Sequence, residues 1–360
     1  MKLRSFVILA VLTGVMVVAA IAAGIIQHVP NTVLAEREAA FPDLVERIND
    51  VAAIEIFSPD ERFTISGEAD SWGIAEKKNY AVQRKNVRDF IISLANLKLV
   101  ESKTARPERY SRLEVEDVDQ EDAESRSVVV FDKSGNELAN AIIGRRKYFL
   151  YVDGRGGTYI RRAGEARSWL AEGEINFGTR SHDWLDRLVP LVERDELQEI
   201  QIIQPTLETL VVRKEAVEEE NYAVLNAPAD RELKTVTEAD RLGFVPEKFE
   251  FDDVLPVGEI SFEGPRHIAR YTTFDGLEIT FDVVTKLVGE AAADEIETIR
   301  WARVSARVTS NVAKDQREAV TARAEDINER TSPWVYRLED LDAARTTKTL
   351  LDLYKEPATR

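Results

Sequence analysis

Apolar residues are most concentrated near the N-terminus, where they form one continuous run. The run extends from Phe6 to Ile26, and its 21 residues carry no charge. Because an α-helix rises about 1.5 Å per residue, such a run spans roughly 30 Å, the thickness of a bilayer's hydrocarbon core. The pattern therefore predicts an N-terminal transmembrane helix. Its membrane-anchoring residues are expected to be Phe6, Leu9, Val11, Val17, Ile21 and Ile26.

The basic residues around this run predict its orientation. Lys2 and Arg4 precede it, and the next basic residue is Arg37. Basic flanks stay in the cytoplasm, so we expect the N-terminus inside and the rest of the chain outside. The alternative is a cleaved signal peptide, for which an Ala-Ile-Ala sequence at 20–22 offers a cleavage site. The run exceeds the roughly 7–15 apolar residues of an ordinary signal peptide, which favours an uncleaved anchor.

After residue 50, apolar and polar residues alternate, which is typical of strands with one buried face. A helix is indicated where Val87, Phe90, Ile91 and Leu94 recur at helical spacing after Asn86, a suitable N-cap residue. The complete series of elements predicted for this part of the chain is strands at 53–57, 62–66 and 71–75, a helix at 87–99, strands at 127–131, 137–143, 148–152 and 158–162, and a short helix at 165–172.

The same order of elements returns in the second half of the chain. Matching Ile54 with Ile200 and Phe131 with Phe274 gives offsets of 146 and 143 residues. The elements predicted for this half are strands at 197–203, 208–214 and 221–225, a helix at 230–242, and strands at 258–262, 269–274, 277–284 and 299–308.

These patterns predict an α+β fold, in which a transmembrane helix is followed by two tandem repeats of an antiparallel sheet with a packed helix. The predicted segments are a cytoplasmic tip and anchor at 1–27, a juxtamembrane stalk at 28–50, a first repeat at 51–195, a second repeat at 196–308 and a C-terminal helical segment at 309–360.

Composition narrows the possible partners. The chain has 360 residues and a net charge of −17, and its 48 lysines and arginines are scattered without a basic stripe. Such an acidic surface repels nucleic acid, so we expect no nucleic-acid partner. The absence of cysteine excludes disulfides, thiol chemistry and a lipoprotein anchor.

Motifs that could carry chemistry have simpler structural interpretations. Glycines at 154–157 lie between predicted strands, which indicates a hairpin turn rather than a phosphate-binding loop. The acidic run at 114–124 lacks the glycine and final glutamate of an EF-hand, so a solvated loop is favoured over a Ca²⁺ site. The basic triplet at 145–147 could contact an acidic partner or lipid headgroups, but a solvated hairpin end is the simpler interpretation.

No catalytic constellation stands out. His28, His182 and His267 are far apart, and none belongs to a metal-binding histidine pair. His182, in the sequence Ser-His-Asp-Trp, is expected to be a loop or core histidine. Serine-nucleophile signatures are missing, and no carboxylate pair is singled out among 65 acidic residues. We therefore expect no catalytic residues, no metal and no cofactor.

Several local sequences together resemble the bacterial domain-of-unknown-function family 4340. They are the tryptophan-containing strand Ser71-Trp72-Gly73-Ile74, the helix from Val87 to Leu97, the basic link from Lys103 to Leu113 with Tyr110, and the Ile143-Gly144 turn. The resemblance extends from about Val51 to Leu287. One departure follows Tyr110, where the family tends to have a Gly- and Leu-rich turn and this chain reads Ser-Arg-Leu-Glu-Val-Glu.

The resemblance implies a cellular role but supplies no catalytic residues. Members of the family are associated with ABC-type export systems related to gliding-motility transporters. From this association we expect a non-catalytic, extracytoplasmic accessory subunit whose partners are an ABC-type permease, other membrane-anchored subunits and, through its anchor, the lipid bilayer. The expected location is the bacterial inner membrane, with a single span and a cytoplasmic N-terminus. The alternatives are a carboxylate-based envelope hydrolase, a ligand-binding protein and a structural spacer.

Overall fold

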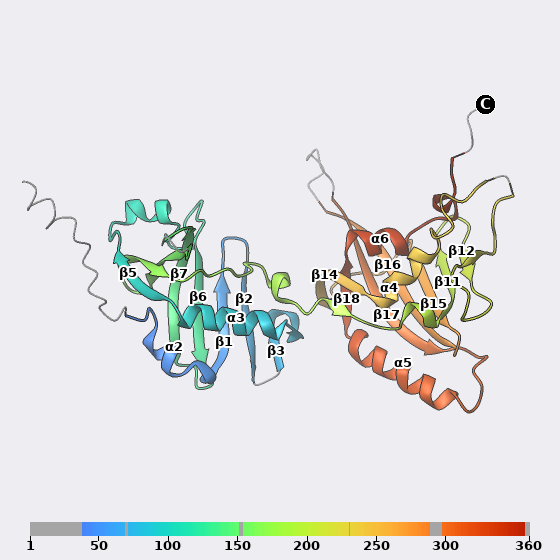
Figure 1. Ribbon diagram of the computed structural model, residues 1–360, viewed down its shortest axis with the longest axis horizontal. Helices are drawn as coiled ribbons and strands as arrows, with labels where there is room; N and C mark the ends of the chain where they lie inside the picture. The colour runs from blue at the N-terminus through green and yellow to red at the C-terminus, as the bar shows by residue number, and fades with distance from the viewer. Residues whose placement is uncertain (1–37, 69–70, 151–153, 230, 289–296, 357–360) are drawn as a thin grey trace, which may run out of the picture.

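A computed structural model describes residues 38–68, 71–150, 154–229, 231–288 and 297–356. Its first half forms a nine-stranded antiparallel sheet in the order β4-β3-β2-β1-β6-β7-β8-β9-β5 (Figure 1). The elements of this half are α2 (Pro42–Glu46), η1 (Ile48–Asp50), β1 (Val51–Phe57), β2 (Arg62–Glu68), β3 (Ser71–Ile74), η2 (Ala75–Lys77), β4 (Tyr80–Ala81), α3 (Arg84–Ala95), β5 (Lys98–Ser102), η3 (Pro107–Leu113), β6 (Arg126–Asp132), β7 (Glu137–Lys147), β8 (Gly157–Arg162) and β9 (Ser168–Glu172).

The second half forms another nine-stranded antiparallel sheet among the described residues, in the order β10-β14-β18-β17-β16-β15-β11-β12-β13. Its elements are η4 (Ser181–Trp184), β10 (Leu188–Val189), η5 (Arg194–Glu196), β11 (Leu197–Ile203), β12 (Leu210–Arg213), β13 (Ala223–Val224), η6 (Asp240–Gly243), α4 (Phe244–Glu247), β14 (Phe249–Pro256), β15 (His267–Thr273), β16 (Leu277–Val288), β17 (Glu297–Val308), α5 (Arg317–Thr331), β18 (Trp334–Leu338), α6 (Asp340–Thr346) and η7 (Leu350–Leu353).

The two sheets share one strand order. Read from the opposite end, the second sheet places β13, β12, β11, β15, β16, β17, β18 and β14 where the first has β3, β2, β1, β6, β7, β8, β9 and β5. Irregularities recur as well: the pairing of β1 with β6 shifts register between Val51 and Ala53, and that of β11 with β15 between Leu197 and Glu199. The equivalent strands β5 and β14 also carry a register shift each, in their pairing with β9 and β18.

Each sheet has an inner face that holds the main core. In β1, Ile54 and Ile56 are fully buried because alternate residues of a strand point to the same side. Figure 1 shows α3 lying across the first sheet, and this helix buries Phe90 and Leu94 in the same core. In the second sheet, α5 packs against β17 and α6 contacts β15 and β18.

The outer faces are only partly covered. β5 lies at the far end of its sheet while β6 lies in the middle, so the link between them crosses the outer face of β9, β8 and β7. This link buries a second small core that contains Tyr110, Val115 and Tyr159. The link from β14 to β15 crosses the second sheet in the same way, over a cluster that contains Val284 and Trp301.

This architecture corrects the expected fold class. The described residues are mostly β, and their two longest helices, α3 and α5, have 12 and 15 residues. An α+β class is wrong because most apolar residues alternate along strands instead of following helical spacing. Residues 165–172, expected to be helical, contain β9, and the expected helix at 230–242 is replaced in its described part by loops and η6. Residues 258–262 belong to the link after β14 and form no strand.

The expected membrane helix and single-pass localisation are corrected too. Among the described residues, no helix combines the length and apolar content that a membrane crossing requires. The two longest helices there, α3 and α5, bury Phe90 and Leu94, and Val320 and Ile327, in the protein core. The anchor residues expected between Phe6 and Ile26 lie outside the described residues.

A buried ion pair joins the two sheets. Lys77 is 7% exposed, and its Nζ lies 2.6 Å from Oδ1 of Asp253 and donates to the carbonyl of Val254 at 3.2 Å. Beside it, the ring of Tyr80 makes edge-on contacts with those of Phe251 and Trp334 at centroid distances of 5.6 and 4.9 Å. The first unit therefore docks on β14 and β18 through both charge and aromatic packing.

We expect Lys77→Met to weaken this junction, because it leaves the Asp253 carboxylate without its partner. Breaking a buried pair costs about 3–5 kcal/mol, and the lower end applies because Asp253 stays partly solvated. Lys78→Met, at the adjacent exposed lysine, is the matched control for urea unfolding. Equal free energies of unfolding for the two variants would contradict the role of Lys77.

The free energy of unfolding should also depend on pH, because of Asp342. Asp342 of α6 is 5% exposed, and burial raises its pKa to about 6 although Arg345 lies 3.0 Å away. The folded chain holds this proton more tightly than the unfolded chain, whose carboxyl has a pKa near 3.8. Stability from this group is therefore present below about pH 4 and falls by about 3 kcal/mol as pH rises to about 6.

Asp342→Asn removes this dependence. Relative to the parent, its free energy of unfolding should rise by about 2–3 kcal/mol between pH 4 and pH 7, as measured by urea titration at each pH. The control is Asp340→Asn, an exposed aspartate on the same helix, which should show no such rise. A constant difference between Asp342→Asn and the parent across this range would show that Asp342 titrates normally.

Candidate functional site

The uncovered outer face of the second sheet is polar. In β16, Ile279 and Phe281 point to the core and are fully buried. Glu278, Thr280 and Asp282 alternate with them and therefore point to the outer face. An outward face with this composition can contact water or a polar partner.

Neighbouring strands place arginines beside these carboxylates. The register sets Arg307 opposite Glu278 and Arg303 opposite Asp282 on β17, and Arg270 of β15 opposite Thr280. We call this surface the arginine face. Its residues are Glu199, Gln201, Arg213, Arg266, Arg270, Thr272, Glu278, Thr280, Asp282, Arg303, Ser305 and Arg307.

Glu278 of β16 lies between arginines from the two neighbouring strands. It is 8% exposed and accepts hydrogen bonds from Arg307 Nε at 2.7 Å and Nη2 at 3.0 Å, a bidentate pairing. The guanidinium of Arg270 lies 4.0 Å from the same carboxylate. The hydrogen bond to Glu278 raises the pKa of Arg307.

Asp282 is shared by two further arginines. Arg266 Nη1 and Arg303 Nη2 lie 2.9 and 2.8 Å from its Oδ2. The Arg303 guanidinium also lies 4.1 Å from the ring centroid of Phe262, which belongs to the link that crosses the sheet. Carboxylates therefore hold the arginines in a fixed array.

The arginine face is positive although the chain is acidic. It has five arginines and three carboxylates, an excess of two positive charges, whereas the whole chain carries −17. Arg307 keeps 67% of its side chain exposed even though its inner nitrogen atoms are bonded to Glu278. The array can therefore offer guanidinium donors to carboxylates of another molecule.

The first sheet shares one part of this arrangement. Arg161 of β8 occupies the position that Arg303 has on β17, and its guanidinium lies 4.7 Å from the ring of Tyr110 in the crossing link. Arg161 also donates to the carbonyl of Val115 at 2.9 Å and pairs with Asp117. In both units an outward arginine thus fastens the link to the sheet.

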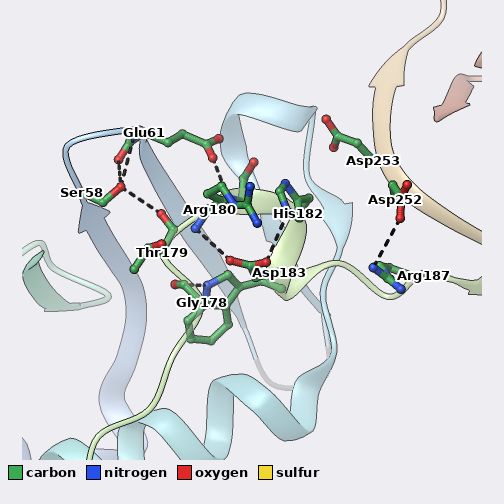
Figure 2. Close-up of polar contacts among 12 residues, drawn as sticks. Ser58, Glu61, Gly178, Thr179, Arg180, His182, Asp183, Arg187, Asp252 and Asp253 are labelled. Atoms are coloured by element: carbon green, nitrogen blue, oxygen red, sulfur yellow. Dashed lines mark hydrogen bonds and ion pairs between the residues drawn. The ribbon is translucent and has the colours of Figure 1, made fainter. Parts of the chain in front are cut away.

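A second polar cluster lies where the turn between β1 and β2 meets the connector between the sheets, as Figure 2 shows. The Ser58 hydroxyl lies within hydrogen-bond distance of the carbonyls of Glu61 and Thr179, at 3.2 and 3.1 Å. His182 Nε2 lies 3.3 Å from Oδ1 of its neighbour Asp183. Because the Ser58 hydroxyl bonds to main-chain carbonyls and not to a base, this cluster holds the connector against the β1–β2 turn and lacks the pairing of a catalytic nucleophile with its base.

The remaining sequence-predicted features fall in separate places. Gly157 opens β8 rather than a helix. In the acidic run, Glu116 accepts a hydrogen bond from the main chain of Glu124 at 2.7 Å. Burial, followed by the charge of Arg300, lowers the pKa of His267. His28 and the six predicted anchor residues lie outside the described residues.

Within the described ranges, no group of three or more histidine and carboxylate side chains is arranged to hold a metal ion. The two carboxylates at the centre of the arginine face are held by guanidinium groups instead. This face is therefore suited to binding by charge and hydrogen bonds rather than to metal chemistry.

The arginine face was not predicted, although the sequence contains a signal for it. Polar residues alternate at 278, 280 and 282 and again at 303, 305 and 307, and this period of two places each set on one face of a strand. The alternation within one strand does not show which other strands are its neighbours, so it does not show which polar residues lie together. That depends on the strand order and on the path of the crossing link.

Comparison with known families identifies the class of protein. The sequence model of the family described as "Domain of unknown function (DUF4340)" matches residues 72–265, from β3 to the link after β14. The match covers more than half of the chain, so this chain belongs to the DUF4340 family. No curated protein and no solved structure matches it.

We expect Arg307→Ala to destabilise the fold, because it leaves the buried Glu278 carboxylate without its bidentate partner. The cost should be about 1–3 kcal/mol in the free energy of urea unfolding. The double variant Arg307→Ala/Glu278→Gln removes the unpaired charge and should recover most of the loss. If both variants are equally destabilised, the pairing does not hold the array together.

Proposed function

We propose that this chain is a non-catalytic interaction subunit of an ABC-type transport complex and that it binds a partner subunit through the arginine face. The observation that carries the binding surface is the positive, pre-ordered array of guanidinium groups on an open sheet face. The transport setting rests on the association of the DUF4340 family with gliding-motility-type ABC export systems.

The chemistry of the array indicates the kind of partner. Guanidinium groups bind carboxylates with two parallel hydrogen bonds, so an acidic protein surface is the favoured occupant. The chain as a whole is strongly acidic and repels such a surface, which favours docking at the arginine face, where the charge is positive. We propose that the acidic surface belongs to the permease or to another membrane-anchored subunit of the complex.

A pre-ordered array also favours binding energetically. Arg303 is fixed by Asp282 and Phe262, and Arg307 is fixed by Glu278, before any partner arrives. Ordering long side chains costs about 0.5–1.5 kcal/mol each on binding, and much of that cost is avoided here. Arginine is also one of the residue types that contribute most to interfaces.

Hydrolysis by carboxylates is less well supported. Glu278 and Asp282 accept hydrogen bonds from arginines, which compensate their charge and occupy the oxygen atoms that an acid or base would use. Asp342 has a raised pKa, but it is buried beside the inner face of the sheet, where a substrate does not reach it. A general acid or base must lie within hydrogen-bond reach of the proton that it transfers.

We expect charge reversal on the arginine face to release the partner. In a detergent extract of the native cells, tagged full-length protein should recover an ABC permease and its ATPase, and Arg213→Glu/Arg270→Glu should reduce that recovery at least tenfold. The control is Arg62→Glu, an exposed arginine on the first sheet that pairs with Glu55 at 3.1 Å. Circular dichroism verifies that both variants fold.

Equal recovery by both variants would show that the partner binds elsewhere. Failure of the parent protein to recover any ABC subunit would contradict the proposed complex itself.

A further inference from the structure

A pocket of about 440 Å³ lies on the first unit, between α3 and the connector that follows β9. Its size is within the range of about 300–1,000 Å³ that is usual for small-molecule sites. The pocket shares no residue with the arginine face, which belongs to the second unit. It is lined by Asn86, Asp89, Phe90, Ser93, Asn176, Phe177, Gly178, Asp183 and Trp184, all of which the structure describes.

Hydrogen bonds fix the two walls of this pocket. The indole Nε1 of Trp184 donates to the carbonyl of Gly178 at 3.0 Å, which closes a turn of the connector (Figure 2). The main-chain N–H of Gln83, directly before α3, donates to the carbonyl of Trp184 at 2.9 Å. The walls are therefore in place before a ligand arrives, and a preformed pocket loses less conformational entropy when it binds.

The base of the pocket is aromatic. Phe90 of α3 contacts Phe177 and Trp184 of the connector, with ring centroids 4.9 and 5.6 Å away. Phe90 and Trp184 are buried, whereas Phe177 is half-buried. Arg126 lies 5.6 Å from the ring centroid of Phe177, but it does not line the pocket. Such a base favours a ligand that presents apolar C–H groups on one side.

The polar side chains of α3 in this pocket carry oxygen atoms that can accept hydrogen bonds. Asn86 Nδ2 donates to Oε1 of Gln83 at 3.1 Å. The Ser93 hydroxyl donates to the main-chain carbonyl of Asp89 at 2.7 Å. Because an amide oxygen and a hydroxyl oxygen each have two lone pairs, Asn86 and Ser93 can still accept from a ligand.

Asp89 adds a carboxylate whose charge is already compensated. Its Oδ2 accepts from Lys85 Nζ at 2.6 Å, and Arg88 Nε lies 3.6 Å from its Oδ1. The hydrogen bond from Lys85 lowers the pKa of Asp89. A carboxylate offers about four acceptor positions, so Asp89 can accept from an uncharged donor, whereas a further cation would find its charge already balanced.

The connector supplies the remaining polar groups. Asp183 Oδ2 accepts from the main-chain N–H of Arg180 at 3.1 Å, and Oδ1 lies 3.3 Å from Nε2 of His182 (Figure 2). Asn176 is exposed, and its amide can both donate and accept. Acceptor oxygen atoms therefore outnumber donors among the side chains of the pocket, so the complementary ligand is rich in donors.

We propose that this pocket binds a neutral saccharide of one or two sugar rings. Sugar hydroxyls are uncharged donors, which suit the oxygen atoms of Asn86, Ser93 and Asp183, and each hydroxyl can accept from Asn176 in return. The C–H face of a sugar ring covers the part of Phe177 that is open to the pocket. The pocket lies on a different unit from the arginine face, so either proposal can fail without the other.

The probes are maltose, cellobiose and lactose, three neutral disaccharides. Each is titrated into the purified full-length chain and followed by calorimetry and tryptophan fluorescence. We expect saturable binding of at least one of them, with one disaccharide per chain. The emission should change on binding because Trp184 lines the pocket.

Two asparagine variants test the location of the site. Asn86→Ala and Asn176→Ala each remove an amide of the pocket and should weaken binding of the disaccharide at least fivefold. The matched control is Asn96→Ala, at an exposed asparagine directly after α3 that does not line the pocket, and it should bind like the parent. Circular dichroism verifies that all three variants fold.

The proposal is overturned if none of the three disaccharides binds, or if both pocket variants bind as tightly as Asn96→Ala. Spermidine supplies charged donors instead of hydroxyls and should bind at least tenfold more weakly than the disaccharide. Tighter binding of spermidine would make the pocket a site for organic cations and would equally contradict the proposal.

Discussion

The chain's return path across each sheet is the constraint on which the rest of this structure depends. In both units the strand before the crossing link, β5 or β14, lies far from the strand that follows the link: β5 is the last strand of its sheet, and β14 is the last but one, next to β10. The next segment must therefore cross the outer face, and it needs contacts of its own to stay there. The arginine–aromatic contacts of Arg161 with Tyr110 and of Arg303 with Phe262 hold the link against the sheet at equivalent positions of the two units.

This crossing divides each outer face into a covered half and an open half. In the first unit the open half carries the exposed ion pair of Arg62 with Glu55. In the second unit it carries the arginine face, where the buried Glu278 and the half-buried Asp282 hold guanidinium groups in place. The two units thus share a strand order but differ in their outer surfaces, and the Lys77–Asp253 pair joins them.

Strands with unbroken alternation could be predicted from the sequence, and 53–57, 62–66 and 277–284 are confirmed as β1, β2 and part of β16. The DUF4340 family is confirmed as well. β5 and β14 were missed because a register shift interrupts the alternation in each, for example between Phe251 and Asp253. The arginine face could not be predicted because its residues come from separate strands, and only the three-dimensional order brings them together.

Site-specific photo-crosslinking in the native cells can show whether the arginine face contacts a subunit of an ABC transporter. A photoreactive amino acid at Thr280, in the middle of the arginine face, should capture a subunit of the ABC transporter. The same group at Thr64, on the outer face of the first sheet, should not capture it. Crosslinking of an ABC subunit from Thr64 but not from Thr280, or from neither position, would contradict the account.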